Sequence, residues 1–343
     1  MTSSCVVTND FNEDGFIDLF IGGRAVPWNY GEIPQSYLLQ NDGTGKFIDV
    51  TEKYAKGLSK IGMVTNAVWF DIDKDGDKDL IVSCEWGGIT AFINTKGFFL
   101  KKELTDKNGW WNFILPVDVD NDGDMDLIAG NLGLNSRLKA SKDQPIRLYY
   151  NDFDDNGKKE QVLTYYLKNK EITFSNKGEL ERQMPVLKKK YIYAEDFAKA
   201  GFSDIFPSEK IQSSTILTAD YFSNAVLIND GKLNFTVMPL PWEAQLTSYR
   251  DATIVYANND NLPDIFLAGN YYGNNIHNGR YDADFGTILI NQGKGNFSCE
   301  NLKGIILKGE VRHIKPIKIS QKQAFVLAKN NDSLVVIISH SLK

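Results

Sequence analysis

Acidic side chains recur in this sequence in a nine-residue pattern whose spacing suits a hard metal cation. The pattern is Asp-x-Asp/Asn-x-Asp/Asn-Gly-x-x-Asp/Glu, followed by an apolar run, and its copies begin at Asp10, Asp71, Asp118 and Asp152. Carboxylates this close together repel one another unless a cation lies between them. Oxygen ligands at alternate positions, with Gly at position six for a sharp turn, favour Ca²⁺ over soft metals. The pattern therefore predicts about four structural Ca²⁺ sites.

Each site is expected to use side chains from positions one, three, five and nine and a backbone carbonyl from position seven. The predicted ligands are Asp10, Asn12, Asp14, Phe16 and Asp18; Asp71, Asp73, Asp75, Asp77 and Asp79; Asp118, Asp120, Asp122, Asp124 and Asp126; and Asp152, Asp154, Asn156, Lys158 and Glu160. A fifth copy runs from Tyr256 to Asp264. It has lost its first ligand and its Gly, so we interpret it as a plain turn.

The acidic pattern allows two other interpretations, an EF-hand and an ordinary Asp-Gly turn. An EF-hand needs Glu at position twelve and flanking helices. Position twelve is apolar in every copy and the flanks are strand-like, which excludes an EF-hand. Ordinary exposed Asp-Gly turns would show similar residues without any ion. The recurrence of one spacing in several copies favours metal binding over such turns.

The residues between the acidic loops predict the strands that hold them. An apolar triplet followed by Asn, Gly and Phe recurs at Tyr37–Phe47, Val226–Phe235 and Ile288–Phe297, and this unit is typical of a hairpin turn. Short antiparallel strands in groups of four are typical of propeller blades. The sequence predicts an all-β, six- to seven-bladed β-propeller of four-stranded antiparallel blades. It would span residues 1–343 as a single domain, with a partly helical insertion at residues 188–211.

The acidic loops resemble those of FG-GAP/VCBS repeats in integrin α-type propellers. Stretches such as Gly269–Asn275 and Gly279–Gly286 resemble bacterial ASPIC/UnbV-associated repeat proteins. The resemblance implies structural calcium, an extracellular or cell-envelope location and a role in binding or cell adhesion. It implies no reaction. The sequence shows no signal-peptide pattern and opens on strand-like residues Cys5–Thr8, so we expect a segment of a longer protein.

Aromatic and polar residues gather in the loops expected on the propeller face opposite the acidic loops. This predicted ligand face comprises Arg24, Trp28, Tyr30, Glu85, Trp86, Trp110, Trp111, Tyr249, Arg250, Asp251, Asn270, Tyr271, Tyr272 and Asn274. Exposed aromatic rings beside Asn and Arg can bind a glycan or a polar peptide. Large loop aromatics can instead pack over the blades and close the channel. Both interpretations stay open, and the sequence names no ligand.

Composition and spacing argue against several classes of protein. The chain has 38 basic and 44 acidic residues, a net charge of −6, which disfavours nucleic acid as a partner. The longest apolar runs are strand-length, so no transmembrane segment is predicted. The three cysteines and three histidines match no disulfide framework, zinc site or catalytic triad. The alternative to a binding module is a glycan lyase or hydrolase using Glu85, Arg250 and Asp251.

Overall fold

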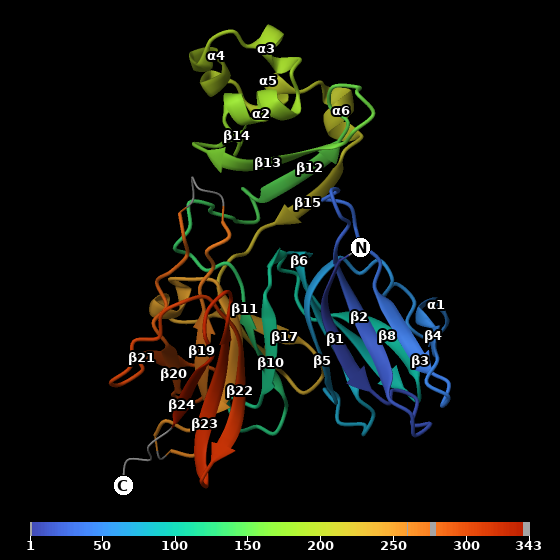
Figure 1. Cartoon of the computed structure of the whole chain (residues 1–343), viewed down its shortest axis with the longest axis vertical. Coiled ribbons are helices and arrows are strands. Elements are labelled where there is room, and N and C mark those ends of the chain that lie inside the picture. Colours follow the sequence, from blue (N-terminus) through green and yellow to red (C-terminus); the bar gives the residue numbers. More distant parts are fainter. Residues whose placement is uncertain (1, 259, 275–278, 339–343) are drawn as a thin grey trace.

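The chain is all-β, with six antiparallel sheets and only short helices (Figure 1). The computed structural model describes residues 2–258, 260–274 and 279–338. Five of the sheets follow one another along an array. Sheet one holds β1 (Thr2–Asn9), β2 (Asp18–Ala25), β3 (Tyr37–Asn41) and β4 (Phe47–Asp49), followed by helix α1 (Thr51–Tyr54). Sheet two holds β5 (Met63–Phe70), β6 (Asp79–Gly87), β7 (Ile89–Thr95) and β8 (Phe98–Glu103), with β9 (Gly109–Trp110) paired to β6.

The other three sheets of the array repeat this order of strands. Sheet three holds β10 (Phe113–Val117), β11 (Asp126–Gly130), β16 (Ala225–Asn229) and β17 (Phe235–Pro239). A short 3₁₀ helix, η1 (Trp242–Gln245), leads to sheet four, which holds β18 (Tyr249–Val255), β19 (Asp264–Gly269), β20 (Thr287–Asn291) and β21 (Phe297–Asn301). Sheet five holds β22 (Val311–Ile319), β23 (Lys322–Lys329) and β24 (Val335–Ile338). The prediction of four-stranded antiparallel sheets is confirmed for sheets one to four.

The five sheets lie side by side through their first strands. Strand β1 contacts β5, β5 contacts β10, β10 contacts β18, and β18 contacts β22. The second strand of each inner sheet is a continuous apolar run because both of its faces are covered. In β6, for example, Leu80 packs toward sheet one and Ile81 packs toward sheet three. This alternation of side chains, two residues per period, builds the cores between neighbouring sheets.

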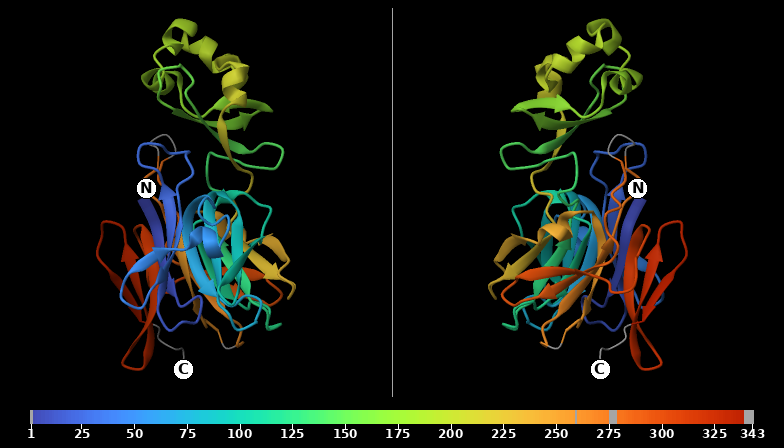
Figure 2. Two further views of the ribbon diagram at one scale, coloured as in Figure 1. Left: turned by 90° about the vertical axis from the view of Figure 1, so that its right-hand side faces the viewer. Right: turned by 90° about the vertical axis from the view of Figure 1, so that its left-hand side faces the viewer.

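A sixth sheet stands apart from the array, together with the helices α2 to α6 that lie between two of its strands (Figures 1 and 2). It has the order β14-β13-β12-β15, with β12 (Ile146–Asn151), β13 (Glu160–Leu167), β14 (Lys170–Thr173) and β15 (Thr215–Ala219). Between β14 and β15 lie α2 (Lys177–Gln183), α3 (Leu187–Lys190), α4 (Ala194–Lys199), α5 (Phe202–Ile205) and α6 (Ser208–Gln212). The helical stretch expected at residues 188–211 therefore begins earlier, at Lys177.

This inserted subdomain, residues 133–222, leaves sheet three after β11 and returns before β16. Its two ends are joined at the base, because Gly133 N donates to Phe222 O at 2.8 Å and Asn131 N donates to Asn224 Oδ1 at 2.6 Å. The helices cover an apolar core of their own, which includes Leu180. No helix among the described residues is long and apolar enough to cross a membrane.

Candidate functional site

Each acidic loop joins the first two strands of a sheet. The loops that begin at Asp10, Asp71 and Asp118 join β1 to β2, β5 to β6 and β10 to β11 in the array. The loop that begins at Asp152 joins β12 to β13, so it lies in the inserted subdomain and not in a sheet of the array. The sequence predicted this loop to lie in the propeller like the other three, because its strand-loop-strand pattern is the same.

The four loops share one backbone conformation. The Gly at position six has a positive φ in every copy, between 82° and 101°. Its N–H donates to the first Asp of the loop at 2.8 to 3.1 Å. Only Gly adopts this left-handed conformation without strain, which is why Gly recurs at position six. In the second and fourth loops the turn brings the side chains of positions one and three toward the acid at position nine, and in the third loop it brings together positions one, three and five.

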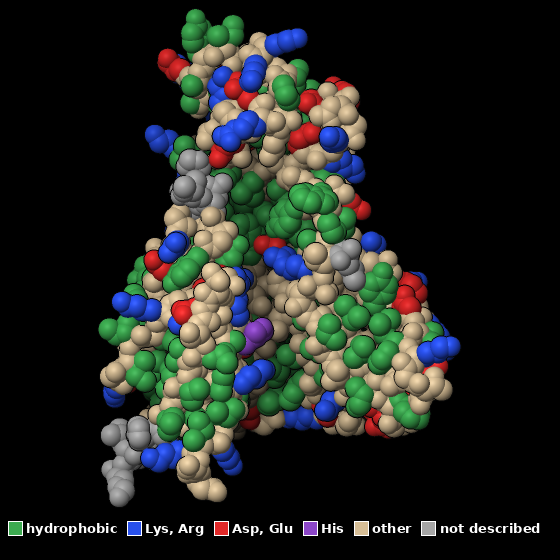
Figure 3. Space-filling view, viewed as in Figure 1, with side chains coloured by type: hydrophobic (Ala, Val, Ile, Leu, Met, Phe, Trp, Pro, Cys, Tyr) green, Lys and Arg blue, Asp and Glu red, His purple; other side chains and the backbone are tan. Residues whose placement is uncertain are grey.

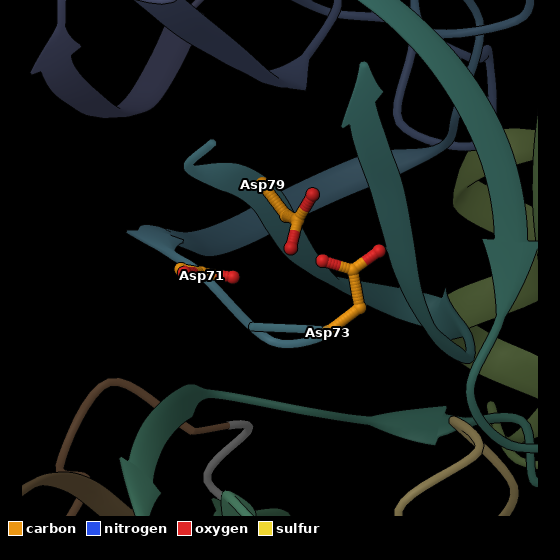
Figure 4. A group of neighbouring side chains, drawn as sticks. All are labelled: Asp71, Asp73 and Asp79. Atoms are coloured by element: carbon orange, nitrogen blue, oxygen red, sulfur yellow. The ribbon is translucent and has the colours of Figure 1, made fainter. Parts of the chain in front are cut away.

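Three of the loops bring acidic oxygen atoms together. In each group the oxygens lie within 4.8 Å of one another, and the groups are Asp71, Asp73 and Asp79; Asp118, Asp120 and Asp122; and Asp152, Asp154 and Glu160. Figure 4 shows the first group, in which Asp71 and Asp73 come from the loop and Asp79 from the start of β6. Such all-oxygen groups have the chemistry that Ca²⁺ prefers.

Buried oxygen atoms without a partner give an independent test of whether these residues suit a cation. Among the described residues, Asp71, Asp118, Asp120 and Asp154 each have one buried carboxylate oxygen with neither a hydrogen bond nor an ion pair. The other buried carboxylate oxygens without a hydrogen bond, on Glu85, Glu181 and Glu310, lie in ion pairs. Buried polar atoms are nearly always paired in proteins, so an orphaned carboxylate oxygen indicates an absent partner. All four atoms lie in the three acidic groups. The residues therefore fit a hard cation.

The electrostatics of the second and third loops agree with this conclusion. Burial raises the pKa of Asp79 to about 7 and that of Asp126 to about 6. The pKa values of Asp73 and Asp120 are raised too, first by burial and then with a contribution from neighbouring carboxylates. A bound cation would oppose these shifts, since it stabilises the ionised form of each carboxyl group.

The first loop is different. No group of three acids converges there in the part of the chain that the structure describes. Instead Asn12 Nδ2 donates to Asp14 Oδ2 at 2.9 Å. The pKa of Asp14 is lowered by the backbone N–H of Phe16 and by Asn12. The degraded fifth loop makes the same bond, from Asn258 to Asp260, so the first loop resembles it in this respect.

The acid at position nine has a role that the sequence did not reveal. Asp79 Oδ2 accepts the N–H of Ile72 at 2.8 Å, and its Oδ1 accepts the N–H of Asn94 at 2.7 Å. Asp18, Asp126 and Asp264 make the same pair of bonds in their own sheets. This acid, interpreted from the sequence only as the closing metal ligand, thus clamps the acidic loop to the turn between strands three and four.

The Asn whose backbone N–H is bonded to this acid also contacts the neighbouring sheet through its side chain. Asn94 Nδ2 in sheet two donates to Phe11 O of sheet one at 2.9 Å, and Asn291 Nδ2 in sheet four donates to Val119 O of sheet three at 2.8 Å. From the sequence, this Asn was interpreted only as part of a hairpin turn. Its side chain also helps to hold adjacent sheets together.

At position seven, the side chains of the first three loops make contacts away from the acidic groups. The ring of Phe16 lies against Gly43, Asp77 Oδ2 accepts the N–H of Lys96 at 2.8 Å, and Asp124 forms an ion pair with Lys74. The last contact joins the second loop to the third. Neighbouring acidic loops of the array therefore lie side by side.

The predicted ligand face divides into buried and exposed residues. Trp111 and Tyr249 are fully buried in the cores between sheets, so they cannot stack on a ligand. Trp110 lies between Trp86 and Phe222, with ring centroids 5.1 and 5.0 Å away. This cluster also contains residues of the inserted subdomain, including Ile146, Leu148 and Leu217. The interpretation in which loop aromatics pack over the sheets therefore applies to Trp86 and Trp110, which form the seat of that subdomain.

Other members of the predicted face keep polar contacts or lie in solvent. Trp28 is 98% exposed. Trp86 Nε1 donates to the hydroxyl of Tyr30 at 2.8 Å. Asn270 is buried, and its side chain donates to the carbonyl of Asp284 and accepts the N–H of the same residue. The guanidinium of Arg280 lies over the ring of Tyr272. Asn274 ends one of the described segments and has polar contacts of its own.

The groups proposed for glycan cleavage are each held by another partner. Glu85 forms an ion pair with Arg24. Asp251 Oδ2 accepts the N–H of Ile314 at 2.9 Å and lies 3.4 Å from His313 Nδ1. His277 and His340 lie outside the described residues. The arrangement of the described residues favours no acid–base pair.

A cavity of about 440 Å³ in the inserted subdomain was not predicted. It lies between β14 and helices α2 and α4, where Arg137, Phe174 and Phe197 are among its lining residues. The guanidinium of Arg137 lies 5.4 Å from the centroid of the Phe174 ring. The residues that line the cavity come from separate segments of the sequence, so no local motif could have revealed the cavity.

Comparison with known proteins locates the repeats. A family model described as FG-GAP-like repeat matches residues 10–82 and 71–129. The biofilm matrix protein Bap1 of V. cholerae is similar in structure with a TM-score of 0.33 and 10% sequence identity, over 95% of this chain and 65% of that one. This chain thus spans less than two thirds of the length of Bap1. No curated protein matches the sequence. The matched residues, 10–129, hold the three acidic loops of the array.

Proposed function

We propose that this protein is a calcium-stabilised β-propeller that acts as a binding or adhesion module outside the cell or in the cell envelope. The observation that carries the proposal is the set of buried carboxylate oxygens without partners in loops two and three. Both loops lie within the segment that matches FG-GAP-like repeats. Such repeats, as the sequence resemblance implies, hold Ca²⁺ in acidic loops between strands.

The propeller interpretation is supported by the order of the sheets. Five sheets contact one another through β1, β5, β10, β18 and β22, so the first strand of each lies innermost. Innermost first strands with radially arranged sheets are the architecture of propeller blades. The blade count of six to seven stays a prediction, because the sixth sheet belongs to the inserted subdomain and not to the array.

Calcium would be held by side chains of positions one and three together with the acid at position nine in the second and fourth loops, and at position five in the third loop. In the second loop these are Asp71, Asp73 and Asp79. A bound Ca²⁺ supplies positive charge that offsets the repulsion among carboxylates. The chain itself contributes the rigid turn, through the Gly76 N–H to Asp71, and the clamp from Asp79 to Asn94. Metal binding of this kind stabilises the ends of the two strands that the loop joins, and it involves no reaction.

Thermal unfolding with and without a chelator tests the proposal. Ligand that binds only the folded state adds about 3 kcal/mol per site at a hundredfold excess over its Kd. We therefore expect EDTA to lower the melting temperature of the purified protein, and Ca²⁺ but not Mg²⁺ at equal concentration to restore it, because Mg²⁺ demands a smaller octahedral site. An unchanged melting temperature would mean that the loops are only turns.

The binding role is proposed for the surface opposite the acidic loops. Trp28 is 98% exposed there and is available for an unknown protein or glycan ligand. The alternative of a glycan lyase or hydrolase has less support, since Glu85 and Asp251 are both engaged.

A further inference from the structure

A lysine of the second acidic loop lies against the third acidic loop. Lys74 occupies position four of the second loop, where its backbone has a positive φ of 63°. Its ammonium group forms an ion pair with Asp124 of the third loop. The same nitrogen lies 3.9 Å from the point that a Cβ atom on Gly123 would occupy. The positive charge of Lys74 is therefore held beside the turn of the third loop.

Asp124 connects this lysine to the acidic group of the third loop. The N–H of Asp124 donates to Asp122 Oδ1 at 2.8 Å. Asp122 belongs to the converging group of three acids, together with Asp118 and Asp120. The pKa of Lys74 is raised first by its hydrogen bond to Asp124, and the charges of Asp122 and Asp118 raise it further. The lysine thus interacts with the carboxylates that would hold Ca²⁺ in this loop.

The third loop contains no basic residue of its own. Residues 118–126 include five Asp and neither Lys nor Arg, and position four is Asn121. The second loop, residues 71–79, has five Asp together with Lys74 and Lys78. Figure 3 shows basic as well as acidic side chains along the lower edge of the array, the edge that holds these loops in Figure 1. Lys74 therefore offsets part of the repulsion among the carboxylates of a loop that is not its own.

The fourth acidic loop has a comparable contact with a lysine from another element. Lys210 Nζ, on α6, donates to Asp152 O at 2.7 Å and forms an ion pair with Asp155. A lysine beside an acidic loop therefore occurs both in the array and in the inserted subdomain. Lys74 allows the cleaner test of such a charge, because its side chain is 51% exposed and that of Lys210 only 19%.

Lys74 and Ca²⁺ would act on the same carboxylates. A cation held by Asp118, Asp120 and Asp122 would be repelled by the nearby ammonium group, because both carry positive charge. The lysine thus stabilises the third loop without Ca²⁺ and opposes the binding of Ca²⁺ to it. The effect is moderate, since exposed ion pairs contribute little to stability and salt screens them.

We propose that Lys74 is an intramolecular counter-ion of the third loop, which stabilises this loop without Ca²⁺ and lowers its Ca²⁺ affinity. Because the lysine belongs to the second loop, one charge links two neighbouring acidic loops. The third loop would then fill at a higher Ca²⁺ concentration than its own carboxylates require. This inference deepens the proposed calcium-binding function and rests on it.

Isothermal titration with Ca²⁺, together with melting temperatures in EDTA and in Ca²⁺, tests the role of Lys74. Lys74→Met should tighten one Ca²⁺ site roughly threefold to tenfold, because it removes a unit charge near a divalent ion. This variant should melt below the wild type in EDTA and gain more on adding Ca²⁺. Lys74→Arg keeps the charge and should stay close to the wild type. The matched control is Lys101→Met, which removes a lysine paired with Glu103 on β8 and should leave Ca²⁺ affinity unchanged.

A double variant assigns the tightened site to a loop. Asp120→Asn removes an acid of the third loop, so Lys74→Met in this background should no longer tighten any site. Tightening that persists in the double variant would mean that Lys74 acts on the acids of its own loop, and it would overturn the inference.

The outcomes separate this inference from the calcium proposal. A wild type that binds no Ca²⁺ would contradict both. Ca²⁺ binding that is equal in the wild type and in Lys74→Met, or tightened equally by Lys101→Met, would overturn only the role of Lys74. A Lys74→Met variant that melts lower in EDTA and in saturating Ca²⁺ by the same amount would show that the ion pair with Asp124 is purely structural. The melting curves also show whether each variant is folded.

Discussion

Asp264 Oδ1 accepts the backbone N–H of Asn291 at 2.8 Å, in a loop that has lost its first acidic position. Its other oxygen accepts the N–H of Ala257 at 2.7 Å. Asp79 makes the same two bonds in a loop with a complete acidic group. The acid at position nine has therefore been kept where the metal-binding residues have not, and its clamp works without a metal.

The clamp predicts a calcium-independent loss of stability. Asp264→Ala leaves two backbone N–H groups without acceptors, and each such buried group costs about 1–3 kcal/mol. We expect the free energy of unfolding in urea to fall by about 2–4 kcal/mol, equally in Ca²⁺ and in EDTA. Asp106→Ala, at a side chain that is 80% exposed, serves as the control. A loss seen only with Ca²⁺ would show that Asp264 acts as a metal ligand.

Substitution of Asp120 in the third loop should raise the melting temperature without calcium and reduce the stabilisation that calcium gives. Asp120 has a buried oxygen without a partner and a raised pKa, so its charge destabilises the metal-free protein. Asp120→Asn should therefore raise the melting temperature in EDTA and reduce the gain on adding Ca²⁺. Titration calorimetry should also show one Ca²⁺ fewer per chain. A variant that melts like the wild type in both buffers would exclude a metal role for this loop.

The stability of the metal-free protein should fall as pH rises. The folded-state pKa values of Asp79, about 7, and Asp126, about 6, lie above the unfolded value of 3.8. Between these values the folded chain binds more protons than the unfolded chain, so stability is lost as pH rises from about 4 to about 7. We expect melting temperatures in EDTA to decrease over this range, and those in saturating Ca²⁺ to decrease less. A rise in EDTA would contradict the assigned direction of the shifts.

The packing of Trp86 and Trp110 against the inserted subdomain predicts that these rings hold the subdomain in place. Trp110→Ala removes a ring that packs against both Trp86 and Phe222, and truncation of a packed Trp costs about 3–5 kcal/mol when it is fully buried. Because Trp110 is only partly buried, a smaller loss is expected. Limited proteolysis should cut within residues 133–222 faster than in the wild type. Trp28→Ala, at a side chain that is 98% exposed, should leave the cleavage rate unchanged.

Local features of the fold were predictable from the sequence because they depend on neighbouring residues. The Asp-Gly pattern fixes a turn that needs a positive φ at Gly76 and its equivalents, and the apolar run after it fixes the second strand. Both features carry their physical cause within nine residues. The positions of all four acidic loops between strands followed from this alone.

Features that depend on distant residues were not predictable. The β12–β13 hairpin has the same local pattern as a strand pair of the array, so its sequence could not show that it leaves the array. The sequence placed Trp110 in a loop, and it could not show that the chain returns at Phe222 to pack against this ring. Signals existed for part of the insertion, since Asn176 and Glu179 form a capping box at the start of α2.

The closed base of the inserted subdomain has a consequence for how this protein can vary. The Gly133–Phe222 and Asn131–Asn224 hydrogen bonds bring the two crossing points together, so the segment between them is a side branch of sheet three. The entropic cost of closing such a branch rises only with the logarithm of its length. We therefore expect the acidic loops and cores of the array to tolerate changes in the length of this segment.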